Sequence, residues 1–215
     1  MASSKQYKKL TKELARLRCE LLPKEFSLSG DYPPEVFTKT VAYRVLAHAE
    51  IESYIEDRAY EAALTATTEW ENSKKVSKTL LGLLAFSGQT MGEPPDSVNP
   101  SQPSQTSNWD DKIRISNKIK TAMNIFYNAI INNHGIKEKN ILRLLLPIGI
   151  EVDKLDPVLL ADLNSFAEVR GEAAHLSASK YRAKQQINPK DELRTVESLA
   201  NRLIDIDRCI DQLLS

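Results

Sequence analysis

Arg170 is the residue whose type and position most strongly suggest chemistry. It follows Phe166 by four residues on a stretch with helical spacing over 157–175, which places it on the apolar stripe of that helix. A buried arginine requires a carboxylate partner, an interface or an anionic ligand. On spacing alone, an ion pair with Glu168, Glu172 or a carboxylate of another helix is the favoured interpretation, and an anionic ligand is the alternative.

His175 comes five residues after Arg170. Five residues turn an ideal α-helix by about 140°, so the two side chains do not share a face. Three arrangements would bring them together: Arg170 reaches around the helix, the helix ends or bends near Gly171, or a second subunit supplies one of the groups. A histidine at a helix C-terminus commonly stabilises the helix dipole, and this structural role is favoured on the pattern alone.

His48 is a polar residue on the apolar stripe of an earlier helix. Arg44 and Glu52 lie one turn on either side of it, so the three side chains can form a ladder along one face. A core histidine paired with Glu52 is favoured over a catalytic one. Glu52 could also orient or neutralise an arginine from another helix.

A basic stretch without acidic residues runs from Ala173 to Lys190. Basic side chains interleaved with an aromatic ring suit the backbone and bases of single-stranded nucleic acid. A solvated loop is the favoured alternative for this stretch taken by itself. Its candidate RNA-binding residues are Lys180, Tyr181, Arg182 and Lys184.

Composition and motifs exclude several classes of protein. The 215 residues carry 29 basic and 29 acidic side chains, a balance that argues against a protein that coats DNA duplexes. Cys19, Cys209 and three scattered histidines form no cluster with zinc-ligand spacing. There is no phosphate-binding glycine loop, HExxH or GxSxG motif, and no run of 18 apolar residues. With no signal peptide visible, we expect a cytoplasmic protein without a metal, a cofactor or a membrane span.

The periodicity predicts an all-α protein. The segment 87–108 holds four of the ten prolines and almost no apolar residue, so we expect a flexible loop within a single helical domain, 1–215. Asp156-Pro157 and Asn188-Pro189 predict helix starts. Apolar spacing predicts helices over 5–22, 35–81 (one helix or two nearly contiguous ones), 109–131, 157–175 and 193–214, and 141–146 is a short apolar stretch.

Three stretches together resemble the HEPN superfamily, the higher-eukaryote and prokaryote nucleotide-binding helical domains. The sequence LNSFAEVRGEAAH at 163–175 is similar to its Arg-x4-6-His signature, and AYRVLAHAEIESYIE at 42–56 is similar to its long second helix with an acidic position. HGIKEKNILRLLLPIGI before the last two helices resembles the RiboL-PSP-HEPN group. The resemblance covers the chain from about residue 35 to its end.

The resemblance implies a helical bundle that dimerises, so that two Arg/His pairs face a shared cleft. Active members are metal-independent endoribonucleases, often toxins or antiphage effectors controlled by a partner. Arg170 and His175 match the signature, Glu52 or Glu50 matches the acidic position, and His48 lies beside it. A histidine base can take the 2′-OH proton of ribose. An arginine can stabilise charge that develops on the phosphate.

Gly171 departs from the family pattern, in which a polar residue often follows the arginine. This departure keeps a second hypothesis open, a catalytically inactive module that binds RNA or nucleotide. A third hypothesis is a helical partner protein in which Arg170 is purely structural. The first hypothesis predicts that RNA is cleaved, the second that RNA is bound but not cleaved, and the third that RNA is neither bound nor cleaved.

Overall fold

The computed structural model describes residues 3–90, 114–175 and 187–215, with the side chains of 169–175 outside that description. The described residues form helices without a strand, which confirms the all-α prediction. No helix in this part of the chain combines the length and apolarity that a membrane span requires. The helices are α1 (Lys5–Leu21), α2 (Pro34–Ser73), α3 (Lys78–Phe86), α5 (Ile115–Ile131), α6 (Glu138–Leu145), α7 (Pro157–His175) and α9 (Pro189–Leu213), with a short 3-10 turn, Val152–Lys154.

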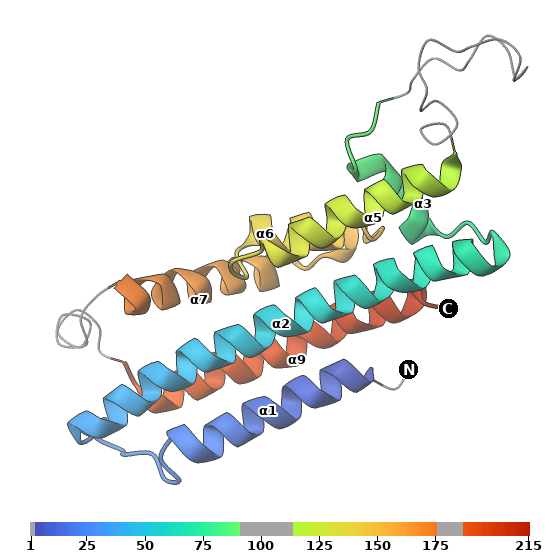
Figure 1. Cartoon of the computed structure of the whole chain (residues 1–215). Coiled ribbons are helices and arrows are strands. Elements are labelled where there is room, and N and C mark those ends of the chain that lie inside the picture. The colour runs from blue at the N-terminus through green and yellow to red at the C-terminus, as the bar shows by residue number, and fades with distance from the viewer. Residues whose placement is uncertain (1–2, 91–113, 176–186) are drawn as a thin grey trace, which may run out of the picture.

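Helix α2 is the axis of the bundle. Its 40 residues contact each of the other six α-helices of the described chain. Figure 1 shows α1 and α9 on one side of α2, and α5, α6 and α7 on the other. Small buried side chains such as Ala59 and Ala63 allow neighbouring helices to approach α2 closely. The long second helix expected from the sequence is therefore the element against which the rest of the bundle packs.

The expected helix over 35–81 is divided into two. Lys74 adopts a left-handed conformation with φ 61°, and its amide donates to the Trp70 carbonyl, which ends α2. The Ser77 hydroxyl then accepts a hydrogen bond from the Leu80 amide at 3.2 Å and begins α3. Of the two arrangements expected from the sequence, the structure has two nearly contiguous helices.

Helix starts follow the expected capping residues. The Asp156 carboxylate accepts from the Val158 amide, and the Asn188 side chain accepts from the Lys190 amide, each at 2.9 Å. Helix α5 is described from Ile115, so the expected start near Trp109 lies outside the described residues, as does most of 87–108.

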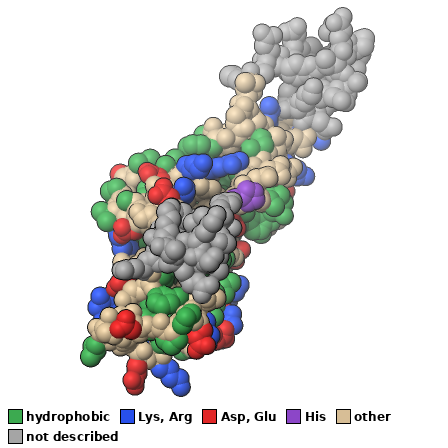
Figure 2. Space-filling view, turned by 90° about the vertical axis from the view of Figure 1, so that its left-hand side faces the viewer, with side chains coloured by type: hydrophobic (Ala, Val, Ile, Leu, Met, Phe, Trp, Pro, Cys, Tyr) green, Lys and Arg blue, Asp and Glu red, His purple; other side chains and the backbone are tan. Residues whose placement is uncertain are grey.

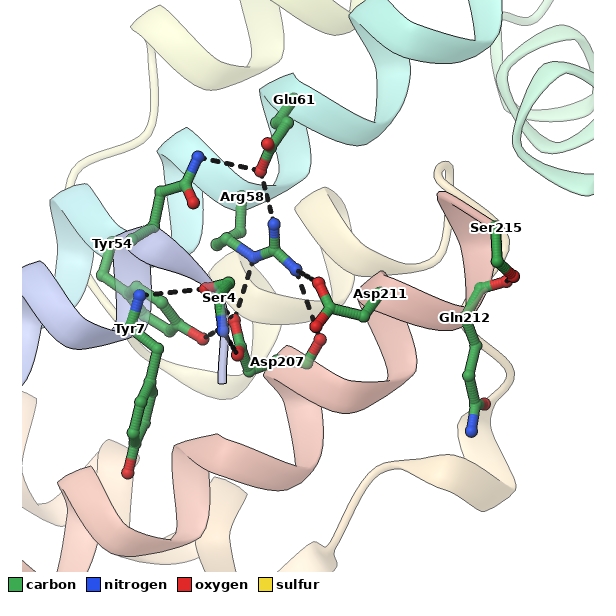
Figure 3. Close-up of polar contacts among 10 residues, drawn as sticks. Ser4, Tyr7, Tyr54, Arg58, Glu61, Asp207, Asp211, Gln212 and Ser215 are labelled. Atoms are coloured by element: carbon green, nitrogen blue, oxygen red, sulfur yellow. Dashed lines mark hydrogen bonds and ion pairs between the residues drawn. The ribbon is translucent and has the colours of Figure 1, made fainter. Parts of the chain in front are cut away.

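A buried ion cluster joins three distant parts of the chain (Figure 3). The Asp207 carboxylate, on α9, is 0% exposed and lies 3.0 Å from Nε of Arg58, on α2, which is 1% exposed. Asp207 also accepts hydrogen bonds from the Tyr54 hydroxyl at 2.9 Å and from the Ser4 hydroxyl at 2.6 Å. The other two guanidinium nitrogens of Arg58 donate hydrogen bonds, Nη1 to Glu61 and Nη2 to Asp211. These hydrogen bonds and ion pairs offset the free-energy cost of burying the charges. The same contacts connect α1, α2 and α9.

Candidate functional site

Helix α7 carries both signature residues, and the structure shows how its position is fixed. Arg202 of α9 forms ion pairs with Asp156, at the start of α7, and with Asp162. The backbone remains α-helical through Arg170 and Gly171 to His175, so the helix does not end near Gly171. The side chains of Arg170 and His175 lie outside the described residues.

Phe166, one turn before Arg170, is packed between two residues of α2. The His48 ring stacks on it at 6.1 Å between centroids with 25° between planes, and Cζ of Arg44 lies 5.7 Å from its centroid. His48 is 1% exposed and Phe166 2%. These contacts hold the described part of α7 against the first half of α2.

His48 and Glu52 form the pair expected from their spacing. Nδ1 of His48 lies 3.5 Å from Oε2 of Glu52, whose side chain is 16% exposed. Glu50, the other acidic candidate, is half-buried on the same helix. Through its stack on Phe166, the buried His48 ring packs α2 against α7.

The expected ladder along α2 is wrong at Arg44. Its guanidinium binds the Glu192 carboxylate of α9 through two hydrogen bonds, with Nε donating to Oε2 at 2.6 Å and Nη2 donating to Oε1. Both side chains are at most 10% exposed. Burial raises the pKa of the Glu192 carboxyl, and Arg44 opposes that rise. A bidentate partner from another helix provides better geometry than His48 one turn away.

A pocket of about 630 Å³ opens beside Ala167, three residues before Arg170. It lies between α2, the connection from α5 to α6, α6 and α7. Among the described residues, its lining contains three cations, two histidines and two amides, but no carboxylate: His48, Asn132, His134, Gly135, Lys137, Lys139, Asn140, Arg143 and Ala167. In Figure 2, which faces the end of the molecule where α7 ends, Lys and Arg side chains and a histidine gather on the upper part of the surface. The pocket is thus suited to an anion.

A hydrogen-bond network holds the wall of this pocket. The amide of Asn133, a residue that is 7% exposed, donates to Glu56 Oε1 at 2.7 Å and to the Gly135 carbonyl at 3.1 Å. The Asn140 side-chain amide donates to Oδ1 of Asn133 at 2.9 Å. Burial raises the pKa of Glu56, with the hydrogen bond from Asn133 opposing the rise. Because α2, the connection and α6 are linked in this way, the wall is formed before any ligand binds.

The sequence predictions missed most of this pocket. His134, Lys137, Lys139 and Arg143 lie within ten residues of one another, and only Glu138 among them is acidic. That local excess of basic side chains was a usable signal. The predicted RNA-binding residues Lys180, Tyr181, Arg182 and Lys184 lie outside the described residues, and their role stays a prediction.

No group of three or more His, Cys, Asp or Glu side chains within the described ranges is arranged to hold a metal ion. Cys19 is exposed and Cys209 half-buried, and neither is in a disulfide.

Comparison with known proteins places the chain in a family. No curated protein and no solved structure matches the chain significantly. A family model described as RiboL-PSP-HEPN matches residues 5–214, nearly the whole chain. The long α2, with the His48–Glu52 pair and with His48 stacked on Phe166 of α7, agrees with the resemblance seen in the sequence. The chain belongs to the RiboL-PSP-HEPN family.

Proposed function

We propose that this protein is a metal-independent endoribonuclease that acts as a homodimer. The observation that carries the proposal is the position of the Arg-x4-His stretch, at the end of α7 and directly beyond a cationic pocket without carboxylates. Membership of the HEPN family, whose activities are of the ribonuclease or nucleotide-binding type, supports it. The whole chain, 1–215, functions as one domain in this proposal.

The proposed reaction uses the 2′-OH of the substrate as the nucleophile. His175 takes the 2′-OH proton while the 2′ oxygen attacks the adjacent phosphorus. Arg170 stabilises the negative charge that builds on the phosphoryl oxygens. The bond to the 5′ oxygen breaks, that oxygen takes a proton from water, and His175 returns its proton to the solvent, so the products are a 2′,3′-cyclic phosphate and a 5′-hydroxyl end.

The homodimer is proposed from the family resemblance, and the course of the α7 backbone is compatible with it. On a continuous helix, positions 170 and 175 are about 140° apart around the axis and about 7.5 Å apart along it. On such a helix the two positions therefore do not share a face. A second protomer can complete the pair, which supports the two-subunit site that the family resemblance implies.

The proposal includes a biological setting. A nuclease that cleaves cellular RNA must be restrained, so we propose a toxin or antiphage effector of the cytoplasm, controlled by a partner protein. Expression of the wild-type chain should then arrest growth, and Arg170→Ala or His175→Ala should relieve the arrest.

The test is incubation of the purified protein with total RNA in EDTA. We expect cleavage by the wild type and at least a 100-fold slower rate for Arg170→Ala and for His175→Asn. Arg208→Ala is the matched control, since the Arg208 side chain is 50% exposed on α9 and, within the described residues, forms an ion pair with its neighbour Asp205 alone. Full cleavage by both signature variants, or cleavage that stops in EDTA, contradicts the proposal.

A second function is favoured by Gly171, the departure from the family pattern. In this alternative the domain binds RNA or nucleotide without cleaving it. It predicts binding that weakens with salt in the wild type and in His175→Asn alike, with no product from either.

A further inference from the structure

We propose that the pocket beside Ala167 holds the phosphate backbone of single-stranded RNA, with Lys139 and Arg143 as its principal contacts. This inference rests on the proposed function and adds a subsite outside the Arg-x4-His stretch. It assigns a binding role to α6, to which the sequence predictions gave none.

Two cationic side chains of α6 support binding of an anionic strand. Lys139 and Arg143 are both exposed and lie four residues apart, on one face of the helix and about 6 Å apart along its axis. Neither has a carboxylate within 4.0 Å among the residues that the structure describes. Two like charges at this spacing destabilise an isolated helix. An anionic ligand that contacts both removes that repulsion, and their spacing suits successive phosphates.

The neighbouring residues favour an anion as well. Lys137 adds a third cation at the pocket, and its only described acidic partner, Glu168, lies 3.6 Å away with a side chain that is 66% exposed. His134 is exposed at the opposite edge. Among the described residues, the lining of the pocket carries cationic side chains and no carboxylate, which favours an anionic ligand.

The pocket is preformed, which lowers the cost of binding. Glu56, Asn133 and Asn140 fix the connection between α5 and α6. The Asn164 side chain of α7 accepts from the Glu138 amide at 2.9 Å and fixes the start of α6 to α7. A ligand therefore meets a wall that is already ordered, and little conformational entropy is lost. The volume of about 630 Å³ is within the usual range of ligand sites.

The position of the pocket connects it to the proposed reaction. Ala167 forms part of its lining and precedes Arg170 by three residues, about 4.5 Å along the α7 axis. A strand held by α6 thus passes the end of α7. An acidic segment of a protein could also use such a pocket, but the row of cations along one helix face suits a regularly spaced polyanion better.

The test measures RNA binding in the full chain with His175→Asn, which prevents turnover. A fluorescein-labelled oligouridylate is titrated at several NaCl concentrations and followed by fluorescence anisotropy. We expect Lys139→Ala/Arg143→Ala to raise the Kd at least tenfold. The slope of log K against log salt concentration should fall by about 1.4, because two contacts to a single strand are lost.

The matched control is Lys8→Ala/Lys12→Ala on α1. These lysines are also exposed, four residues apart and without an ion pair in the described chain, but they lie on the other side of α2. We expect less than a twofold change in Kd for this pair, and circular dichroism checks that both double variants remain folded. Equal weakening by the two pairs, or no weakening by the α6 pair, overturns the inference. Stronger competition by polyglutamate than by unlabelled RNA of the same charge also overturns it, since the occupant would then be an acidic protein.

Cleavage assays with the signature variants, and with the α6 double variant in a chain that keeps His175, test this inference and the proposed function independently. If the α6 pair abolishes binding but Arg170→Ala and His175→Asn both cleave as fast as the wild type, the subsite is correct and the assignment of the catalytic residues is wrong. If Arg170→Ala abolishes cleavage and the α6 pair leaves KM unchanged, the nuclease assignment is correct and the subsite is wrong.

Discussion

The bidentate pair between Arg44 and Glu192 provides a quantitative test of how α7 is positioned. Arg44→Met removes the cation but keeps an unbranched side chain, and leaves the Glu192 carboxylate buried without its partner. Removing one member of a buried ion pair costs about 3–5 kcal/mol in proteins generally. The contact between Arg44 and the Phe166 ring is lost as well. We therefore expect the free energy of unfolding at pH 7 to fall by about 3 kcal/mol.

Urea denaturation followed by circular dichroism measures this loss. Arg16→Met is the control, because Arg16 also pairs with two glutamates but its side chain is 54% exposed on α1. Exposed pairs contribute about 0–1 kcal/mol, so the control should remain close to the wild type. The double variant Arg44→Met/Glu192→Met should lose at least 2 kcal/mol less than the sum of the two single changes, because no buried charge is left unpaired.

The pH dependence of Arg44→Met gives a second, independent measurement. Burial already raises the pKa of the Glu192 carboxyl, and loss of Arg44 removes the interaction that opposes the rise. A carboxyl with a raised folded-state pKa contributes stability that is present below its unfolded value, about 4.3, and is lost as pH rises through the folded value. The deficit of the variant should therefore be smallest near pH 4 and grow towards pH 7. A deficit below 1 kcal/mol, additive single changes or a deficit independent of pH would refute the reasoning.

Three further perturbations test other contacts. Gly82→Ala should destabilise the protein by about 1–3 kcal/mol, because an added Cβ would lie 2.5 Å from the Pro147 carbonyl oxygen; an unchanged thermal unfolding midpoint would contradict this close approach. Burial raises the pKa of Tyr54 above its ordinary value of 10, so stability present below pH 10 should be lost as pH rises further, by about 1.4 kcal/mol per pH unit for this group. Urea midpoints between pH 9 and 11 measure this slope, which should be shallower in Tyr54→Phe; an equal slope in the variant would argue against it. Ser4→Ala should cost about 1 kcal/mol, since this hydroxyl caps α1 and donates to Asp207, and a chemical denaturation midpoint equal to that of the wild type would show that the contact contributes nothing.

Local signals predicted much of this fold. The capping residues Asp156 and Asn188 marked helix starts that the structure confirms, because such signals act within a few residues. The break at Lys74 was less visible, since a lysine rather than a glycine adopts the left-handed conformation there. The helical period identified the apolar face of α2 around Ile51 and Ile55.

Residues whose partners are distant in sequence were harder to predict. Arg58 interrupts the apolar face of α2, yet its partners Asp207 and Asp211 lie on α9, about 150 residues later. No residue close to Arg58 in the sequence predicts these two partners. The pocket beside Ala167 has the same origin, since four separate segments meet only when the helices pack. The His48–Glu52 pair was found because both members lie on one helix.

The link between Ser4 and Asp207 has a consequence for folding kinetics. It closes a loop of 203 residues, whereas most helix bundles are dominated by contacts close in sequence. Closing so long a loop costs chain entropy, and only the contacts of a nearly complete bundle offset that cost. We expect α1 to dock after α2 and α9 have paired. Loss of the Ser4 hydroxyl should therefore speed unfolding and leave the folding rate almost unchanged.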